Sequence, residues 1–173
     1  KRREIISGDA EYVIINYDGL EIVSEAVAEG GFDLIIVDEA THYKNPQTKR
    51  WKVLNALLTP DKWLWMMTGT PAAQSPVDAY GLAKLVSPTN VPRFASAFRD
   101  QVMTKITNFR WIPKENATDI VYQALQPAIR FTKEECLDLP PMVYVKREVA
   151  LTRQQLKYYK LLKDQMVMDA AGE

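Results

Sequence analysis

The sequence predicts an α/β fold in which helices flank a parallel sheet. Two runs, residues 32–37 and 63–67, are almost entirely apolar. Such runs are typical of strands that are covered on both faces. Stretches with apolar residues at helical spacing follow each run. This alternation of strand and helix favours a doubly wound layer with right-handed crossovers.

The first part of the chain supplies the elements of this layer. A short β-rich run at residues 12–15 predicts a further strand, and a turn-like cluster follows it. The helices predicted for the layer lie at residues 20–28, 48–58 and 77–86.

The pattern changes after about residue 91. Short helices are predicted at residues 93–102 and 119–125, around a polar stretch at 104–118. Trp111 lies in this stretch among basic residues, a mixture that is suggestive of a nucleic-acid surface, although tryptophan more often belongs to a core. Core positions are expected for the other three tryptophans, which are Trp51, Trp63 and Trp65.

The C-terminal part predicts a linker and a last helix. Residues 139–141 read Leu-Pro-Pro, which indicates a linker, and residues 143–145 alternate like an edge strand. Thr152 and Gln155 form a capping-box pattern for a helix that reaches about residue 168. One face of this helix carries Leu156, Tyr159, Leu162 and Met166.

Composition excludes several classes of function. The chain has 173 residues, with 22 Lys+Arg against 22 Asp+Glu, so any nucleic-acid binding must come from a local patch. Cys136 and His42 are the only cysteine and histidine, which excludes an internal disulfide, a zinc cluster and a histidine-based triad. No apolar stretch could span a bilayer, so we expect no membrane partner. This composition suits a reducing, intracellular compartment, the cytoplasm or the nucleus.

The strongest chemical signal is a pair of acids, Asp38 and Glu39, directly after the apolar run 32–37. Ionised carboxylates near a covered strand are costly unless they meet a cation or hydrogen-bond donors. Ligands of open α/β sheets bind outside the carboxyl ends of the strands. The pair therefore indicates a metal–nucleotide site, in which one acid holds Mg²⁺ and the other orients water. The alternative is that both acids simply begin a solvated loop.

A second polar loop, Thr68-Gly69-Thr70-Pro71, follows the next apolar run. Gly69 permits a backbone conformation that other residues resist, and two hydroxyls flank it. In a parallel sheet this loop opens at the same edge as Asp38 and Glu39. On its own it could be a plain turn.

The order and spacing of these two loops resemble motifs II and III of superfamily-two helicases. Residues 38–45 are similar to the D-E-A-H-R-x-K-N segment of Swi/Snf-type ATPases, and residues 68–75 to their S/T-G-T-P-x-x-N/Q region. Three further landmarks follow the family order: residues 14–18 resemble motif Ib, residues 125–130 the L-x-P-F-x-x-R run, and residues 139–159 the L-P-P-K … L-T-x-x-Q-x-x-x-Y stretch. The resemblance covers residues 12–162.

The resemblance implies a role for each matching residue. Asp38 would hold Mg²⁺, usually through water, and Glu39 would orient the water that attacks the γ-phosphate. Residues that would couple the nucleotide site to the DNA track and the second lobe are Thr41, His42, Thr68, Gly69, Thr70 and Gln74. Residues that would lie near nucleic acid are Asn16, Tyr17, Lys44 and Asn45. Two positions depart from the pattern: Thr41 stands where the family usually has His, and Phe131 follows Arg130 where a second Arg is common.

The implied fold is a RecA-like (P-loop NTPase) parallel sheet with flanking helices, here an incomplete lobe. None of the seven glycines is followed by Lys, so the sequence holds no G-x-x-x-x-G-K-[ST] phosphate loop. We expect the chain to begin downstream of that loop and not to hydrolyse ATP alone. The expected domains are residues 1–132 (part of lobe 1), 133–150 (linker and edge strand) and 151–173 (a helix leading into lobe 2).

The function implied is an ATP- and Mg²⁺-dependent translocase on double-stranded DNA, working with the second helicase lobe of the same chain. Two alternatives stay open: a superfamily-two helicase that unwinds DNA or RNA, and a non-catalytic scaffold that binds nucleic acid or protein. The intact pair of Asp38 and Glu39 argues against the scaffold.

Overall fold

The computed structural model describes residues 6, 10–138, 140 and 143–171, in two compact units, Lys1–Arg130 and Phe131–Glu173. The expected domain boundaries at 132 and 150 stay a prediction, and Leu139 and Pro141 of the expected linker lie outside the described residues. Among the helices that the structure describes, not one combines the length and the apolar character that a bilayer crossing requires.

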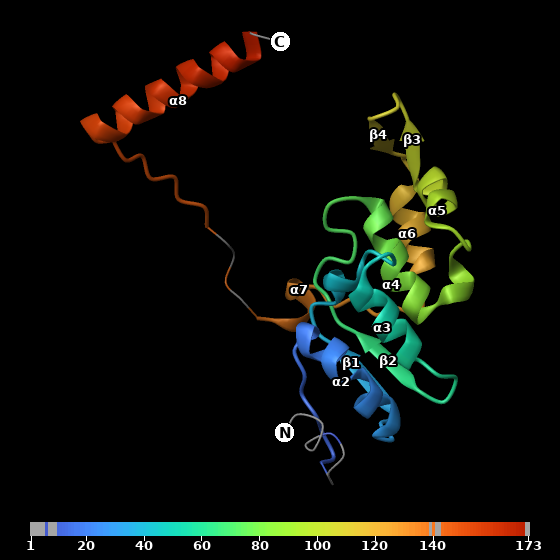
Figure 1. The fold of residues 1–173 in the computed structure, drawn as a ribbon. Coiled ribbons are helices and arrows are strands. Elements are labelled where there is room, and N and C mark those ends of the chain that lie inside the picture. Colours follow the sequence, from blue (N-terminus) through green and yellow to red (C-terminus); the bar gives the residue numbers. More distant parts are fainter. Residues whose placement is uncertain (1–5, 7–9, 139, 141–142, 172–173) are drawn as a thin grey trace. The chain divides into compact units, whose positions relative to one another are not determined.

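The centre of the first unit is a two-stranded parallel sheet (Figure 1). Strand β1 (Leu34–Val37) pairs with β2 (Trp63–Met66), and Val37 lies opposite Met66. The connection between the strands runs through the 3₁₀ turn η1 (Ala40–Tyr43) and helix α3 (Lys49–Leu57). The predicted α/β alternation and parallel pairing are confirmed for these two strands.

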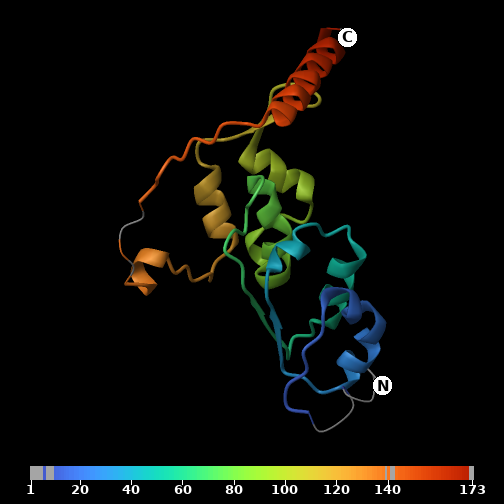
Figure 2. The ribbon, with the colours of Figure 1, turned by 90° about the vertical axis from the view of Figure 1, so that its left-hand side faces the viewer.

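Helices cover one face of this sheet. Helix α2 (Tyr17–Glu29) packs against α3, and Figure 2 shows α2 on one side of the two strands. Helix α4 (Ala79–Val86), which follows the 3₁₀ turn η2 (Pro76–Asp78), completes the cover. The covered face carries alternate residues of both strands, namely Ile35, Val37, Leu64 and Met66.

The other face of the sheet is exposed, so the expectation of strands covered on both sides is wrong for the described residues. Ile36, Trp63 and Trp65 are 54%, 70% and 58% exposed. The core position predicted for Trp51 is confirmed, whereas those predicted for Trp63 and Trp65 are wrong. The register gives the reason: Ile36 lies opposite Trp65, so both point away from the face that the helices cover.

The rest of the first unit forms a second core of helices. The elements are η3 (Pro88–Asn90), α5 (Ala95–Val102), β3 (Met103–Lys105), β4 (Trp111–Pro113) and α6 (Ala117–Ala124). Phe98 and Val102 of α5 are fully buried against Tyr80 of α4 and Val121 of α6. Strands β3 and β4 form an antiparallel hairpin within the stretch that the sequence marked only as polar.

Two predicted strands do not form. Residues 12–15 have no strand partner within the described part of the chain. Tyr12 and Ile14 are exposed, while Val13 and Ile15 pack against the α2 core. Residues 143–145 are exposed and irregular. Both segments have strand-like composition, but a strand also needs a neighbouring edge to pair with.

The second unit contains α7 (Lys133–Cys136) and α8 (Arg153–Ala171). The predicted capping box is confirmed. Thr152 N–H donates to Gln155 Oε1 at 3.0 Å, and Gln155 N–H donates to Thr152 Oγ1 at 3.3 Å. The predicted apolar face of α8 is exposed, at Leu156, Tyr159, Leu162 and Met166.

Candidate functional site

The two predicted loops leave the sheet at the same edge. Met67 N–H donates to the Val37 carbonyl at 2.8 Å, and Ala40 N–H donates to the Met67 carbonyl at 2.9 Å. These bonds extend the parallel pairing beyond β1 and β2. Asp38 and Glu39 therefore lie beside the start of the Thr68–Pro71 loop, as the sequence predicted.

The acid pair adopts a constrained backbone conformation. Glu39 has φ +46° and ψ +53°, and it is the one non-glycine residue with positive φ in the described chain. Asp38 Oδ1 accepts the Glu39 N–H at 2.9 Å, which supports this conformation. Both side chains are exposed. A left-handed backbone conformation is uncommon for Glu and costs about 1 kcal/mol or more. The surrounding fold must therefore stabilise this conformation at Glu39.

Tyr17 ties helix α2 to the acid pair. Its hydroxyl donates a hydrogen bond to the Asp38 carbonyl. Its ring lies 4.7 Å from the His42 ring between centroids, and the Arg50 guanidinium lies 5.2 Å from its centroid. Burial, and then the negative charges of Asp38 and Glu39, raise the pKa of the Tyr17 hydroxyl. The raised pKa of the Tyr17 hydroxyl keeps it protonated, and able to donate to the loop, over a wider range of pH.

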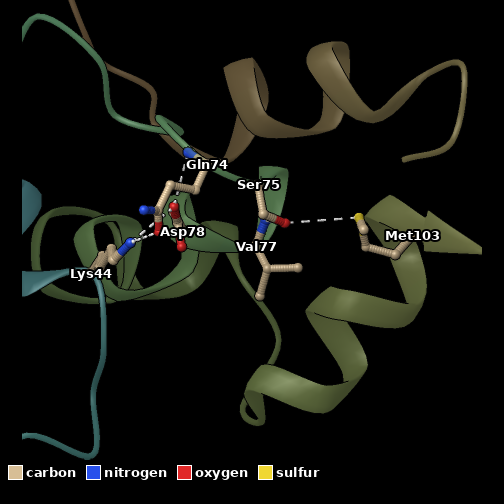
Figure 3. Close-up of polar contacts among 6 residues, drawn as sticks. All are labelled: Lys44, Gln74, Ser75, Val77, Asp78 and Met103. Carbon is tan, nitrogen blue, oxygen red and sulfur yellow. Dashed lines mark hydrogen bonds and ion pairs between the residues drawn. The ribbon is translucent and has the colours of Figure 1, made fainter. Parts of the chain in front are cut away.

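Lys44 joins the acid-pair loop to the segment after the second loop (Figure 3). Its ammonium donates to Gln74 Oε1 at 2.7 Å and pairs with Asp78 Oδ2 at 3.2 Å. Asp78 Oδ2 also accepts the Gln74 N–H at 3.2 Å. One lysine thus cross-links two loops that are thirty residues apart in the sequence. We call these three residues the Lys44 bridge.

A hollow of about 250 Å³ lies over the bridge. Its lining comes from η1, from the second loop and from η2: Thr41, His42, Lys44, Thr70, Pro71, Ala73, Gln74 and Asp78. Five of the predicted site residues therefore meet around one small polar hollow. Asp38 and Glu39 do not line it.

A buried anchor holds η1 against helix α4. A Cβ atom on Gly81 would lie 2.2 Å from the Lys44 carbonyl oxygen and 2.6 Å from that of Tyr43. Trp51 Nε1–H donates to the Gly81 carbonyl at 2.8 Å in the core. Tyr43 is 1% exposed, and its burial raises the pKa of its hydroxyl to about 12. Only glycine allows α4 to approach the loop this closely.

The second loop differs from its expected conformation at Gly69. The structure gives positive φ to Gly31 but not to Gly69, and no atom would lie within 4 Å of a Cβ on Gly69. Gly69 therefore does not adopt the left-handed conformation that glycine permits. Thr68 Oγ1 accepts the Thr70 N–H at 3.2 Å, and this bond closes the bend instead.

Two residues expected near nucleic acid have their side chains in local turns. Asn16 Oδ1 accepts the Gly19 N–H at 3.0 Å and caps α2. Asn45 Oδ1 accepts the Gln47 N–H at 2.9 Å. Both side chains keep their amide NH₂ groups for other partners.

Sequence reasoning missed three residues that build the site. No sequence pattern marked Asp78, because its partner Lys44 is distant in the sequence. Arg50, which pairs with Asp18 at 2.9 Å, was not marked by any pattern either. Gly81 did have a signal, since a glycine within a helical pattern often marks close packing.

The sequence profile of the SNF2-related domain matches residues 1–173. The chain belongs to the SNF2-related domain family. Its similarity to members of that family confirms the resemblance found in the motifs.

Curated relatives that include the following three match part of this SNF2-related chain. A "SWI/SNF-related matrix-associated actin-dependent regulator of chromatin subfamily A-like protein 1" from Xenopus laevis is 37% identical over 81 residues, which are 47% of this chain and 8% of the relative. The protein of the same name from Xenopus tropicalis is 35% identical over 81 residues, with the same coverage. A "DNA repair and recombination protein RAD54-like" from Gallus gallus is 31% identical over 75 residues, 43% of this chain and 10% of the relative.

The matched region is thus a tenth or less of the length of these relatives. No solved structure matches the chain.

Proposed function

We propose that this chain is part of a RecA-like lobe of an ATP-dependent motor that moves along double-stranded DNA inside the cell. Membership of the SNF2-related family supports the general class of motor. The names of the relatives, a regulator of chromatin and a DNA repair and recombination protein, support DNA as the track. The observation that carries the proposal is the shared sheet edge of Asp38-Glu39 and Thr68–Pro71, joined through Ala40 and Met67.

In this proposal Glu39 positions the attacking water. Its carboxylate is exposed at the carboxyl end of β1 and has no hydrogen bond or ion pair among the described residues. A carboxylate in this state can accept a hydrogen bond from water and orient one of its lone pairs. The left-handed backbone conformation of Glu39 sets the direction in which its side chain extends from the end of β1.

Asp38 is the residue that would hold Mg²⁺. Its carboxylate has one hydrogen bond, from the Glu39 N–H, and the remaining lone pairs face solvent. The described residues contain no group of three acids, histidines or cysteines that could enclose a metal ion. A single carboxylate fits Mg²⁺, which usually keeps several waters and takes few protein ligands. The ion would neutralise charge on the ATP phosphates.

We attribute the exposed face of the sheet to an incomplete lobe. Ile36, Trp63 and Trp65 form an exposed apolar patch, and a patch of this kind often marks a surface that another segment or partner covers. The proposed missing segment carries the phosphate loop, which these 173 residues lack, and it covers this face. Without that segment we predict no ATP hydrolysis by the chain alone.

Coupling is proposed to run through the loops around the Lys44 bridge. Thr41, His42, Thr70 and Gln74 line one hollow with Lys44, so a shift of one loop displaces the other. Thr68 and Gly69 shape the bend that leads into it. Asn16, Tyr17, Lys44 and Asn45 are the proposed neighbours of the nucleic acid; of these, Lys44 is already paired with Asp78.

The test uses the polypeptide that contains this segment together with the phosphate loop and second lobe. ATP hydrolysis is measured with double-stranded DNA, single-stranded DNA and RNA. We expect double-stranded DNA to stimulate hydrolysis most, and Glu39→Gln to lower kcat by about 100-fold or more while ATP still binds. Glu115→Gln, an exposed acid on the loop before α6, is the matched control and should keep full activity. Undiminished hydrolysis by Glu39→Gln would refute the role of the acid pair, and stimulation by RNA alone would refute the DNA track.

A further inference from the structure

The hairpin of β3 and β4 stands apart from the acid pair. Figures 1 and 2 both place it at the end of the first unit that is remote from α2. Its base is fixed to the helical core, because β3 directly follows Val102, which is fully buried. Lys114 N–H closes the base by donating to the Val102 carbonyl at 3.0 Å.

The tip of the hairpin is ordered by its own hydrogen bonds. Ile106 N–H donates to the Arg110 carbonyl at 2.9 Å. Thr107 Oγ1 accepts the N–H groups of Phe109 and Arg110 at 3.3 and 3.0 Å. This ordered tip presents Phe109 with 98% of its surface exposed. A phenyl ring held in water adds nothing to the core, so packing does not explain its place.

The hairpin is basic within a neutral chain. Residues 101–114 contain Lys105, Arg110 and Lys114 and no Asp or Glu, so their net charge is +3. The net charge of the whole chain is zero. The nearest acids, Asp100 and Glu115, lie at the base of the hairpin.

Arg99 adds a fourth cation beside the hairpin. Its guanidinium lies 4.2 Å from the centroid of the Trp111 ring, which holds the charge in place. Its Nε is buried without a hydrogen-bond partner, and the Asp100 carboxylate is 3.7 Å away. Trp111 lies opposite Lys105 in the hairpin. Arg99, which stacks on Trp111, and Lys105 therefore lie on the same face of the hairpin.

We propose that the β3–β4 hairpin is a second nucleic-acid contact, in which the cations bind phosphates and Phe109 stacks on an exposed base. The combination fits nucleic acid because every base offers a flat face to an aromatic ring while the backbone attracts the basic groups. Bases are free for such stacking where a duplex opens into single strands, whereas the bases of a blunt duplex stay stacked on one another. The hairpin therefore selects DNA in which duplex meets single strand. This inference rests on the proposed motor function and adds a preferred structure of its DNA.

The first experiment measures binding by the 173-residue chain with fluorescence anisotropy, using a fluorescein-labelled forked duplex and a blunt duplex of the same sequence. We expect the fork to bind more tightly. Phe109→Ala should weaken fork binding about tenfold and blunt-duplex binding far less. Tyr122→Ala, which removes an aromatic ring that is 59% exposed on α6, is the matched control and should bind the fork like the wild type. Equal binding by wild type and Phe109→Ala overturns the stacking role.

The second experiment tests the phosphate contacts through the salt dependence of binding. The double variant Lys105→Ala/Arg110→Ala should reduce the slope of log K against log salt by about 2 × 0.9 units, since each phosphate contact contributes about 0.9. Lys52→Ala, an exposed lysine on α3, should leave the slope unchanged. An unchanged slope in the double variant, or no DNA binding by the wild type, overturns the proposal and leaves the hairpin to a protein partner.

These outcomes are separate from those of the hydrolysis test. Loss of ATPase activity in Glu39→Gln with unaltered fork binding in Phe109→Ala would refute the hairpin inference and keep the motor. Loss of fork preference in Phe109→Ala without any DNA-stimulated hydrolysis would refute the motor and keep the hairpin as a DNA contact.

Discussion

The contact between Gly81 and the acid-pair loop offers the sharpest test of how the site is built. A methyl group at Gly81 would lie 2.2 Å from the Lys44 carbonyl oxygen and 2.4 Å from its carbonyl carbon. Both are backbone atoms next to the buried Tyr43, so no flexible side chain can move aside. Helix α4 and η1 must therefore separate in Gly81→Ala.

The expected magnitude follows from opposing effects. Inside a helix, alanine is more favourable than glycine by about 1 kcal/mol, and this difference stabilises the variant. Overpacking costs about 1–3 kcal/mol, and the upper value applies where the clash is with backbone. Separation would also stretch the buried Trp51–Gly81 hydrogen bond of 2.8 Å, whose loss costs about 1–3 kcal/mol more. We expect a net loss of about 3–5 kcal/mol.

Urea denaturation, followed by circular dichroism and tryptophan fluorescence, measures this loss. In a thermal melt the lower value corresponds to a fall in Tm of about 6–12 °C. Gly69→Ala is the matched control, because no atom lies within 4 Å of its Cβ and its φ is not left-handed. Its stability should change by less than about 0.5 kcal/mol. Wild-type stability in Gly81→Ala, or an equal loss in Gly69→Ala, would refute the close-approach argument.

Two further predictions concern charge near the site. Burial raises the pKa of Tyr43 from 10.0 to about 12, so the folded state holds this proton more tightly than the unfolded state. The stability that this difference contributes is fully present below pH 10 and is lost as the pH rises to 12. In Tyr43→Phe, the free energy of unfolding in urea should fall less steeply over this pH range. An equally steep fall in the variant would contradict the role of Tyr43. Asp78→Asn removes the charge opposite Lys44, at 3.2 Å, and should cost about 0.5–1 kcal/mol at low salt and less at high salt. Glu148→Gln breaks the exposed Lys146–Glu148 pair and should cost nothing measurable in the same urea assay; equal losses would show that the Lys44 bridge is an ordinary surface pair.

Local patterns were sufficient for the parts of the chain that depend on near neighbours. The apolar runs located β1 and β2, and Thr152 with Gln155 located the start of α8. The shared sheet edge of Asp38 and Thr68 also followed from the sequence, because parallel strands place their carboxyl ends together. The same reasoning failed at residues 12–15, which have the composition of a strand but pair with no sheet edge among the described residues.

Contacts between distant residues needed the tertiary structure. No local pattern links Lys44 with Asp78, or Gly81 with the Lys44 carbonyl, because each contact depends on how α4 packs against η1. The left-handed Glu39 and the exposed face with Trp63 and Trp65 likewise follow from the register of two strands and from what covers them. The sequence alone determined the residue types and their order along the chain. Only packing decided which of them meet, since a contact across thirty residues is selected by the free energy of the whole fold.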